Sequence, residues 1–209
     1  QPSTIYTKSE LIGELLFGDT MHNSPYKLSM GVNESCVKLR CQPQDNELLK
    51  QGIDTFEKFI NNEYRAGISI DNLAAYTLHP FSPSICKDEK AIPDRWTKFP
   101  QKRGFALGTP AICTGHTRIN NHLHFTIKYH QRADNASEYT VVGLSVTPWS
   151  INHEYSDVNG NGCNAAFNPD ELGLARPLTT QDVRNGTKPF WSYSVSWIPS
   201  NKVWSTRSD

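Results

Sequence analysis

The sequence lacks long hydrophobic runs, an excess of charge of either sign and the short motifs of common enzyme classes. No segment approaches the roughly 20 consecutive apolar residues of a membrane-spanning helix, and the mean hydropathy of −0.55 is well below zero. Basic and acidic residues number 21 each, so charge gives no reason to expect nucleic acid or an anionic membrane surface as a partner. The GxSxG, HExxH and phosphate-loop motifs are absent, so no site of the kinds that they mark is indicated.

The sequence also begins without an initiating methionine, and Gln1 is not preceded by the basic and apolar segments of a secretory signal. We therefore expect either that a signal peptide has been removed or that the sequence begins inside a longer protein. A length of 209 residues is enough for one stable hydrophobic core, and a single domain is the simpler expectation.

Two alternating segments within residues 119–148 predict a β-hairpin. The first segment places apolar residues on one face and polar residues on the other, which is typical of a half-buried strand; the apolar residues are Leu123, Phe125, Ile127 and Tyr129. Residues 139–146 are β-branched and apolar nearly throughout, as in a strand buried on both faces. Residues 190–198 alternate serines with apolar and aromatic residues, which predicts a last strand with one aromatic face.

One helix is predicted at about residues 45–64, with Asp45 as its N-cap, Gly67 closing it and an apolar stripe formed by Leu49, Ile53, Phe56 and Ile60. Residues 68–78 are expected to form another strand, interrupted at Asp71-Asn72. We expect the fold to be mainly β: an antiparallel β-sandwich with one packed α-helix and long disulfide-pinned loops.

Five cysteines occur without a CxxC or Cys/His metal-binding spacing, which indicates disulfides in an oxidising compartment. Cys36 and Cys41 lie close together in a polar segment expected to be a loop, where they either bridge each other or reach two different partners. Four prolines predict a long irregular connection at residues 79–108. A bridge between Cys86 and Cys113 would pin this connection to the sheet and is the favoured pairing. The odd fifth cysteine is either free or bonded to a cysteine outside this sequence.

Three N-glycosylation triplets lie in segments that we expect to be loops, and their acceptors are Asn33, Asn135 and Asn185. The triplets favour the secretory route, because they are used only on lumenal or extracellular surfaces. Residues 157–162 match the first half of an EF-hand calcium loop, but Asn168 stands where the closing glutamate belongs. An Asn/Gly-rich turn is therefore the better interpretation of this segment.

Histidines on the polar face of the first hairpin strand are the clearest candidates for site chemistry. His122, His124 and His130 fall on this face, with His116 just upstream, and two histidines at i and i+2 on a strand point the same way. With a third ligand nearby they can hold Zn²⁺ or Cu²⁺. The favoured alternative is an exposed strand face that uses polar residues for solubility, because the sequence places no further carboxylate or thiolate ligand beside them.

A carbohydrate-binding role has weaker support. Exposed aromatic rings can form a sugar platform, and the candidates are Trp149, Trp191, Trp197 and Trp204. The cores of β-sandwiches use the same residues more often, and a carboxylate pair for glycoside hydrolysis cannot be located from sequence.

Several segments resemble the nonaspanins, the transmembrane-nine superfamily. Residues 15–30 (LLFGDTMHNSPYKLSM) are similar to a family segment reading G-E-x-L-x-G-D-x-x-x-x-S-P-Y. Further similar segments follow in order over nearly the whole chain, at residues 121–130, 141–150, 193–195 and 204–209. The last resembles a W-x-[ST]-R-W-D motif that precedes the membrane portion, with Ser208 in place of the family's Trp.

This resemblance implies the amino-terminal lumenal domain of a Golgi or endosomal multi-pass protein, with the vacuole or cell surface as further locations. The resemblance also implies strands upstream and nine membrane spans beyond Asp209. Gln1-Pro2 is similar to the end of a family Phe-Cys-x-Pro motif; its cysteine, with Cys36, Cys41 and Cys163, would form the family's disulfides and leave Cys86 to pair with Cys113. The family is linked to sorting of membrane proteins, adhesion and copper handling. We therefore expect its own membrane domain and membrane-protein cargo as partners, and no enzyme activity, cofactor or small-molecule substrate.

Overall fold

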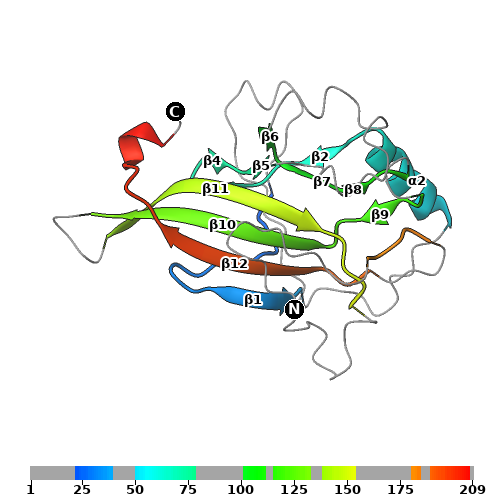
Figure 1. The fold of residues 1–209 in the computed structure, drawn as a ribbon, viewed down its shortest axis with the longest axis horizontal. Helices are drawn as coiled ribbons and strands as arrows, with labels where there is room; N and C mark the ends of the chain where they lie inside the picture. The colour runs from blue at the N-terminus through cyan, green and yellow to red at the C-terminus, as the bar shows by residue number, and fades with distance from the viewer. Residues whose placement is uncertain are drawn as a thin grey trace.

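The computed structural model describes residues 22–39, 50–78, 101–111, 115–132, 138–153, 180–184 and 189–207. Within these ranges the largest element is a six-stranded sheet with the strand order β1-β12-β10-β11-β5-β6 (Figure 1). Its strands are β1 (Glu34–Lys38), β5 (Tyr76–Leu78), β6 (Gln101–Arg103), β10 (His122–Gln131), β11 (Tyr139–Trp149) and β12 (Ser192–Pro199). Figure 1 shows the helix α2 (Lys50–Asn61) at one end of this sheet and the 3₁₀ turn η2 (Trp204–Thr206) at the other.

The predicted hairpin forms the centre of the sheet. Strands β10 and β11 pair antiparallel from His122 opposite Trp149 to Gln131 opposite Tyr139, with a bulge at Lys128/Tyr129. The alternation of apolar and polar residues is therefore confirmed as the signal for this pair. On β11, only every second side chain between residues 142 and 146 is buried and the others are half-buried, so the strand is less deeply enclosed than its composition predicts.

The prediction of an antiparallel sandwich is wrong about strand direction. Strand β12 runs parallel to β10, and β5 runs parallel to β11, so the sheet is mixed. A last strand that returns after a long connection can enter a sheet in either direction, and local sequence does not encode which. The other described strands form three two-stranded pairs: β2 (Arg65–Ala66) with β7 (Phe105–Ala106), β3 (Ser69–Ile70) with β4 (Leu73–Ala74), and β8 (Gly108–Thr109) with β9 (Arg118–Ile119). Besides the main sheet, the described residues thus form three short strand pairs and no second large sheet.

The main core lies on one face of the sheet. Leu123, Phe125 and Ile127 of β10 are at most 1% exposed and pack with apolar residues of β11 and β12. Tyr26 covers this face, with its ring 5.2 Å from that of Phe125 and 5.4 Å from that of Tyr193. Within β12, the aromatic face predicted from the sequence therefore points into this core through Tyr193 and Trp197.

Helix α2 packs on a second cluster through Ile53 and Ile60, as its apolar stripe predicts. The helix ends at Asn61, earlier than predicted, because Glu63 adopts a left-handed conformation with φ of 58°. The amide of Glu63 donates to the carbonyl of Ile60 and that of Tyr64 to the carbonyl of Phe59, which together form a Schellman motif. The predicted closure at Gly67 is thus wrong, and the predicted N-cap Asp45 lies outside the described residues.

The segment after the helix is a tight hairpin followed by a separate strand. Asp71 and Asn72 have φ of 50° and 60° and form the turn between β3 and β4, where the sequence predicts an interruption. The predicted irregular connection is wrong at its end, because residues 101–109 form β6, β7 and β8. Gly104, between β6 and β7, ties these pieces together: its carbonyl accepts from Thr77 Oγ1 at 2.5 Å and from Arg65 Nη2 at 2.6 Å.

Candidate functional site

The most distinctive polar feature is a chain of histidines and serines on the face of the sheet opposite the main core. Strand register places His122 beside Ser192 and His124 beside Ser194. Ser192 Oγ lies 2.7 Å from His122 Nδ1 and 2.9 Å from Nε2 of His153. Ser194 Oγ lies 3.0 Å from His122 Nε2 and 2.7 Å from His124 Nδ1. The five side chains form one continuous network, which we call the His–Ser network.

The His–Ser network is buried, which corrects the expectation of an exposed polar face. His122 is 0% exposed, and the other four members are between 1% and 5% exposed. Burial, reinforced by the neighbouring His153 and His124, lowers the pKa of His122 to about 3, and burial also lowers the pKa of His124. A neutral imidazole donates from one nitrogen and accepts at the other, so each ring can alternate with serine hydroxyls along the network. The predicted half-buried strand is therefore buried on both faces at its start.

The arrangement does not assemble the predicted metal ligands. His130 lies apart from the network, and its Nδ1 is 3.0 Å from the carbonyl oxygen of Ser200; His116 is exposed. Across the described ranges no group of three or more His, Cys, Asp or Glu side chains is placed to hold a metal ion. The Ser–His pairs also resemble a nucleophile and its base, but Ser192 and Ser194 are each only 1% exposed. The geometry supports a structural role for this network.

Sequence reasoning missed three members of the network, namely His153, Ser192 and Ser194. A signal for the two serines exists: the H-x-H of β10 lies beside an S-x-S of β12 with the same period. This matching pattern predicts the His–Ser contacts only once the two strands are known to be neighbours.

Removal of one serine tests the structural role. Ser194→Ala takes the partner from His122 Nε2 and from His124 Nδ1, and it should lower the free energy of unfolding by about 2 to 3 kcal/mol, since each orphaned buried polar group costs roughly 1 kcal/mol or more. Ser196→Ala is the matched control, because Ser196 is the next serine on this face and is half-buried. Chemical unfolding measures the free energy of unfolding of both variants. An equal decrease in the two would show that the hydrogen bonds of Ser194 add nothing to stability beyond the loss of a serine side chain.

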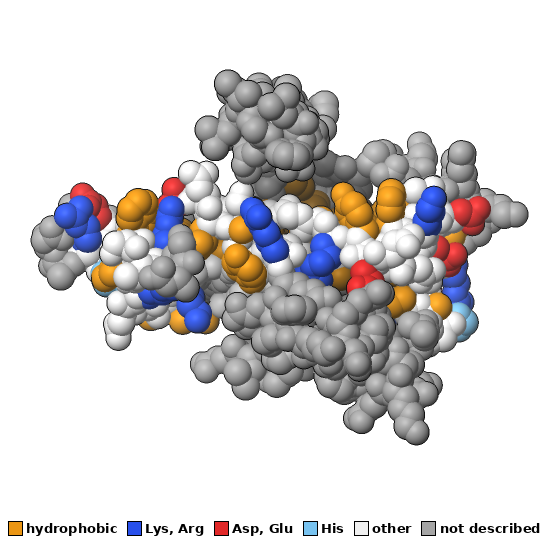
Figure 2. Space-filling view, turned by 90° about the horizontal axis from the view of Figure 1, so that it is seen from above, with side chains coloured by type: hydrophobic (Ala, Val, Ile, Leu, Met, Phe, Trp, Pro, Cys, Tyr) orange, Lys and Arg blue, Asp and Glu red, His pale blue; other side chains and the backbone are white. Residues whose placement is uncertain are grey.

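The visible surface shows no concentration of one charge. On the face seen in Figure 2, basic, acidic and hydrophobic side chains of the described residues are interspersed, in keeping with the balanced composition. Of the four tryptophans considered as a sugar platform, Trp191 packs on the helix cluster and Trp197 on the main core, while Trp204 is 55% exposed. Trp191 and Trp197 therefore pack on two different clusters.

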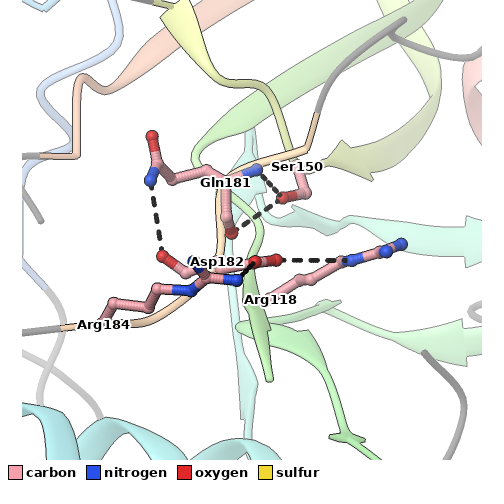
Figure 3. Close-up of polar contacts among 5 residues, drawn as sticks. All are labelled: Arg118, Ser150, Gln181, Asp182 and Arg184. Carbon is pink, nitrogen blue, oxygen red and sulfur yellow. Dashed lines mark hydrogen bonds and ion pairs between the residues drawn. The ribbon is translucent and has the colours of Figure 1, made fainter. Parts of the chain in front are cut away.

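A second polar cluster ties residues 180–184 to the sheet (Figure 3). Asp182 accepts from Arg184 at 2.7 Å and lies 3.7 Å from Nε of Arg118. Ser150 Oγ accepts from the amide of Gln181 at 2.9 Å. The Arg184 side chain is 65% exposed, and ion pairs at such exposure contribute roughly 1 kcal/mol or less. We therefore interpret this cluster as a tether.

Arg207 fixes the C-terminal turn η2 to the body of the fold. Its guanidinium donates to Asp71 Oδ2 at 2.7 Å and to the Asp71 carbonyl at 3.0 Å. It also lies 4.7 Å from the centroid of the Trp204 ring. The Arg207 side chain is only 12% exposed, whereas the Asp71 side chain is 59% exposed. We call this contact the Arg207 latch.

The other predicted sites are only partly visible. Cys36 lies in β1, not in the predicted loop, and it is disulfide-bonded. The remaining cysteines, Asn135, Asn185 and the calcium-like segment 157–162 lie outside the described residues. Asn33 is exposed and directly precedes β1.

The chain was also compared with known proteins. The family model described as endomembrane protein 70 matches residues 1–209. Relatives include Transmembrane 9 superfamily member 10 of Arabidopsis thaliana at 28% identity, covering 100% of this chain and 31% of the relative. A Transmembrane 9 superfamily protein of Schizosaccharomyces pombe is 30% identical over 100% of this chain and 28% of its own length. The human Transmembrane 9 superfamily member 4 is 29% identical, with 100% and 32% covered.

The chain thus spans about a third of the length of the curated relatives it matches. No solved structure matches it. Among the described residues, no helix is both long and apolar enough to cross a membrane. The match to the family model runs from the first residue to the last, in line with the ordered motifs seen in the sequence. The chain belongs to the endomembrane protein 70 family, whose members include the Transmembrane 9 superfamily proteins.

Proposed function

We propose that this chain is a single non-enzymatic lumenal domain of a multi-pass membrane protein of Golgi or endosomal membranes, and that it acts in recognition or sorting of membrane-protein cargo. The observation that carries the proposal is the family match over all 209 residues, combined with coverage of only about a third of relatives that are named for transmembrane segments. In this proposal the membrane portion follows Asp209, and further strands precede Gln1.

Two features of the first strand and its approach support the lumenal side. Cys36 is disulfide-bonded, and disulfides persist in the oxidising secretory compartments. Asn33 is an exposed glycosylation acceptor. Disulfides between the remaining cysteines, including Cys86 with Cys113, are part of the proposal.

The non-enzymatic role is supported by the relatives and by the site. The relatives above are named as transmembrane proteins. The Ser–His pairs of the described chain are buried in one face of the sheet, as expected for a structural role.

The Arg207 latch offers a test of the proposed role. With the membrane portion following Asp209, the latch holds the junction against the β3–β4 turn. Arg207→Ala removes a charge-assisted hydrogen bond and a cation–π contact, so it should weaken the attachment of the junction to this turn by about 1 kcal/mol. In the full-length protein this variant should reduce surface delivery of a membrane-protein cargo.

The control for this test is Arg132→Ala, which removes an exposed ion pair with Glu138 near the β10–β11 loop. Delivery should be unchanged in this control. Cargo delivery that is insensitive to complete loss of the full-length protein would overturn the proposed sorting role, whatever the Arg207 variant does.

A further inference from the structure

The side chain of Asn33 extends the pairing of β1 with β12 by one step. The main-chain register of this pair ends with Glu34 opposite Val195. Beyond it, the backbone amide of Trp197 donates to Asn33 Oδ1 at 2.7 Å. The side-chain carbonyl thus takes the position that a further strand carbonyl would occupy, and it satisfies an amide at the end of the ladder.

This hydrogen bond fixes the direction of the other amide atom. Oδ1 and Nδ2 diverge from the same carbon, so with Oδ1 held by Trp197, Nδ2 points away from the Trp197 amide, and Asn33 itself is exposed. Within the described part of the chain, Nδ2 makes no hydrogen bond of its own. The nitrogen to which a glycan would be attached therefore belongs to a side chain that is anchored through its oxygen and exposed to solvent.

The surface next to Asn33 contains exposed apolar side chains that a glycan would cover. Met30 is 44% exposed and Val32 is 45% exposed in the turn that leads to Asn33. Gly31 shapes this turn with φ of 71°. Ser35, the third residue of the triplet, is also exposed. A surface glycan is large and solubilising, so one attached here would shield two apolar side chains from other proteins.

We propose that Asn33 has two simultaneous roles: its Oδ1 completes the β1–β12 edge, and its Nδ2 carries an N-linked glycan that covers Met30 and Val32. The inference rests on the proposed lumenal location. In the transfer step, Nδ2 bonds to the anomeric carbon of a lipid diphosphate-linked oligosaccharide while the bond from that carbon to the diphosphate oxygen breaks. The lipid diphosphate leaves, and the proton lost by Nδ2 goes to solvent. The product keeps its amide carbonyl, so the bond from Trp197 survives modification.

The test uses the full-length protein made in eukaryotic secretory cells, with a second acceptor triplet placed in a flexible tag at the amino terminus of the mature protein. Peptide mapping after glycosidase treatment in heavy-oxygen water reports each modified asparagine as a labelled aspartate. The wild type and Ser35→Thr should be labelled at Asn33. Ser35→Ala and Asn33→Asp should show complete loss of the glycan while keeping an oxygen acceptor for Trp197.

A fourth variant separates the two roles. Asn33→Ala removes both the glycan and the acceptor, so its melting temperature should fall below that of Ser35→Ala, which removes the glycan alone. Equal melting temperatures for these two variants would overturn the role of Oδ1.

The tag distinguishes failure of this inference from failure of the proposed function. Label on both the tag and Asn33 supports the glycan. Label on the tag with none on Asn33 overturns the glycan at Asn33 and leaves the lumenal location standing. Absence of label from both overturns the lumenal location and the glycan together.

Discussion

Gly104→Ala should lower the free energy of unfolding by about 3 kcal/mol. Gly104 has φ of 71°, where a non-glycine residue costs about 1 to 2 kcal/mol. A Cβ at this position would also overlap the carbonyl oxygen of Ala66 and lie 3.0 Å from its carbonyl carbon. Overpacking against such an immovable backbone group adds roughly 1 to 3 kcal/mol. Equilibrium chemical unfolding measures the total.

The matched control for this change is Gly31→Ala. Gly31 has the same φ of 71°, but a Cβ there would meet nothing within 4 Å. It should therefore show the conformational cost alone, about 1 to 2 kcal/mol. Losses of the same size in both variants would contradict the close approach of Gly104 to Ala66 and, with it, the packing of β2 on the β6–β7 turn.

Acidification from about pH 7.5 to about pH 5 should lower the free energy of unfolding by about 2 kcal/mol through His122 alone. The pKa of His122 is about 3 in the fold against an ordinary value of 6.5. Between these values the unfolded chain binds a proton that the folded chain does not, so stability is complete above about pH 6.5 and falls as the pH drops toward 3. The lowered pKa of His124 acts in the same direction.

Urea unfolding at a series of pH values checks this expectation. His122→Gln should flatten the dependence on pH, whatever it does to stability at neutral pH. His130→Gln is the control, because His130 lies outside the His–Ser network and bonds to the carbonyl of Ser200; it should keep the wild-type slope. A wild type that is equally stable at both ends of the range would show that His122 is not buried in neutral form.

The elements that the sequence predicts well are those whose signal is local. The β10–β11 hairpin follows from alternation over residues 122–130, and the apolar stripe of α2 follows from Ile53 and Ile60 at helical spacing. The end of the helix was missed because Glu63 supplies the left-handed residue that glycine usually provides.

The candidate site was predicted only in part, for a different reason. His122 and His124 were identified, but their burial depends on the neighbouring strand, and a polar strand face is exposed in most antiparallel sheets. The register that brings Ser192 and Ser194 beside them joins residues about seventy positions apart. No periodicity within either segment encodes that pairing.

The parallel pairing of β10 with β12 has a consequence for how the chain reaches its fold. The β10–β11 hairpin closes a short connection and can form in microseconds, whereas docking of β12 joins groups 70 residues apart and must wait for the intervening chain. During synthesis, one edge of β10 and the ring of His122 therefore stay open to solvent until the last strand emerges. In that interval a chaperone would recognise the nascent chain, and a strand from another molecule could pair with the open edge of β10 in place of β12.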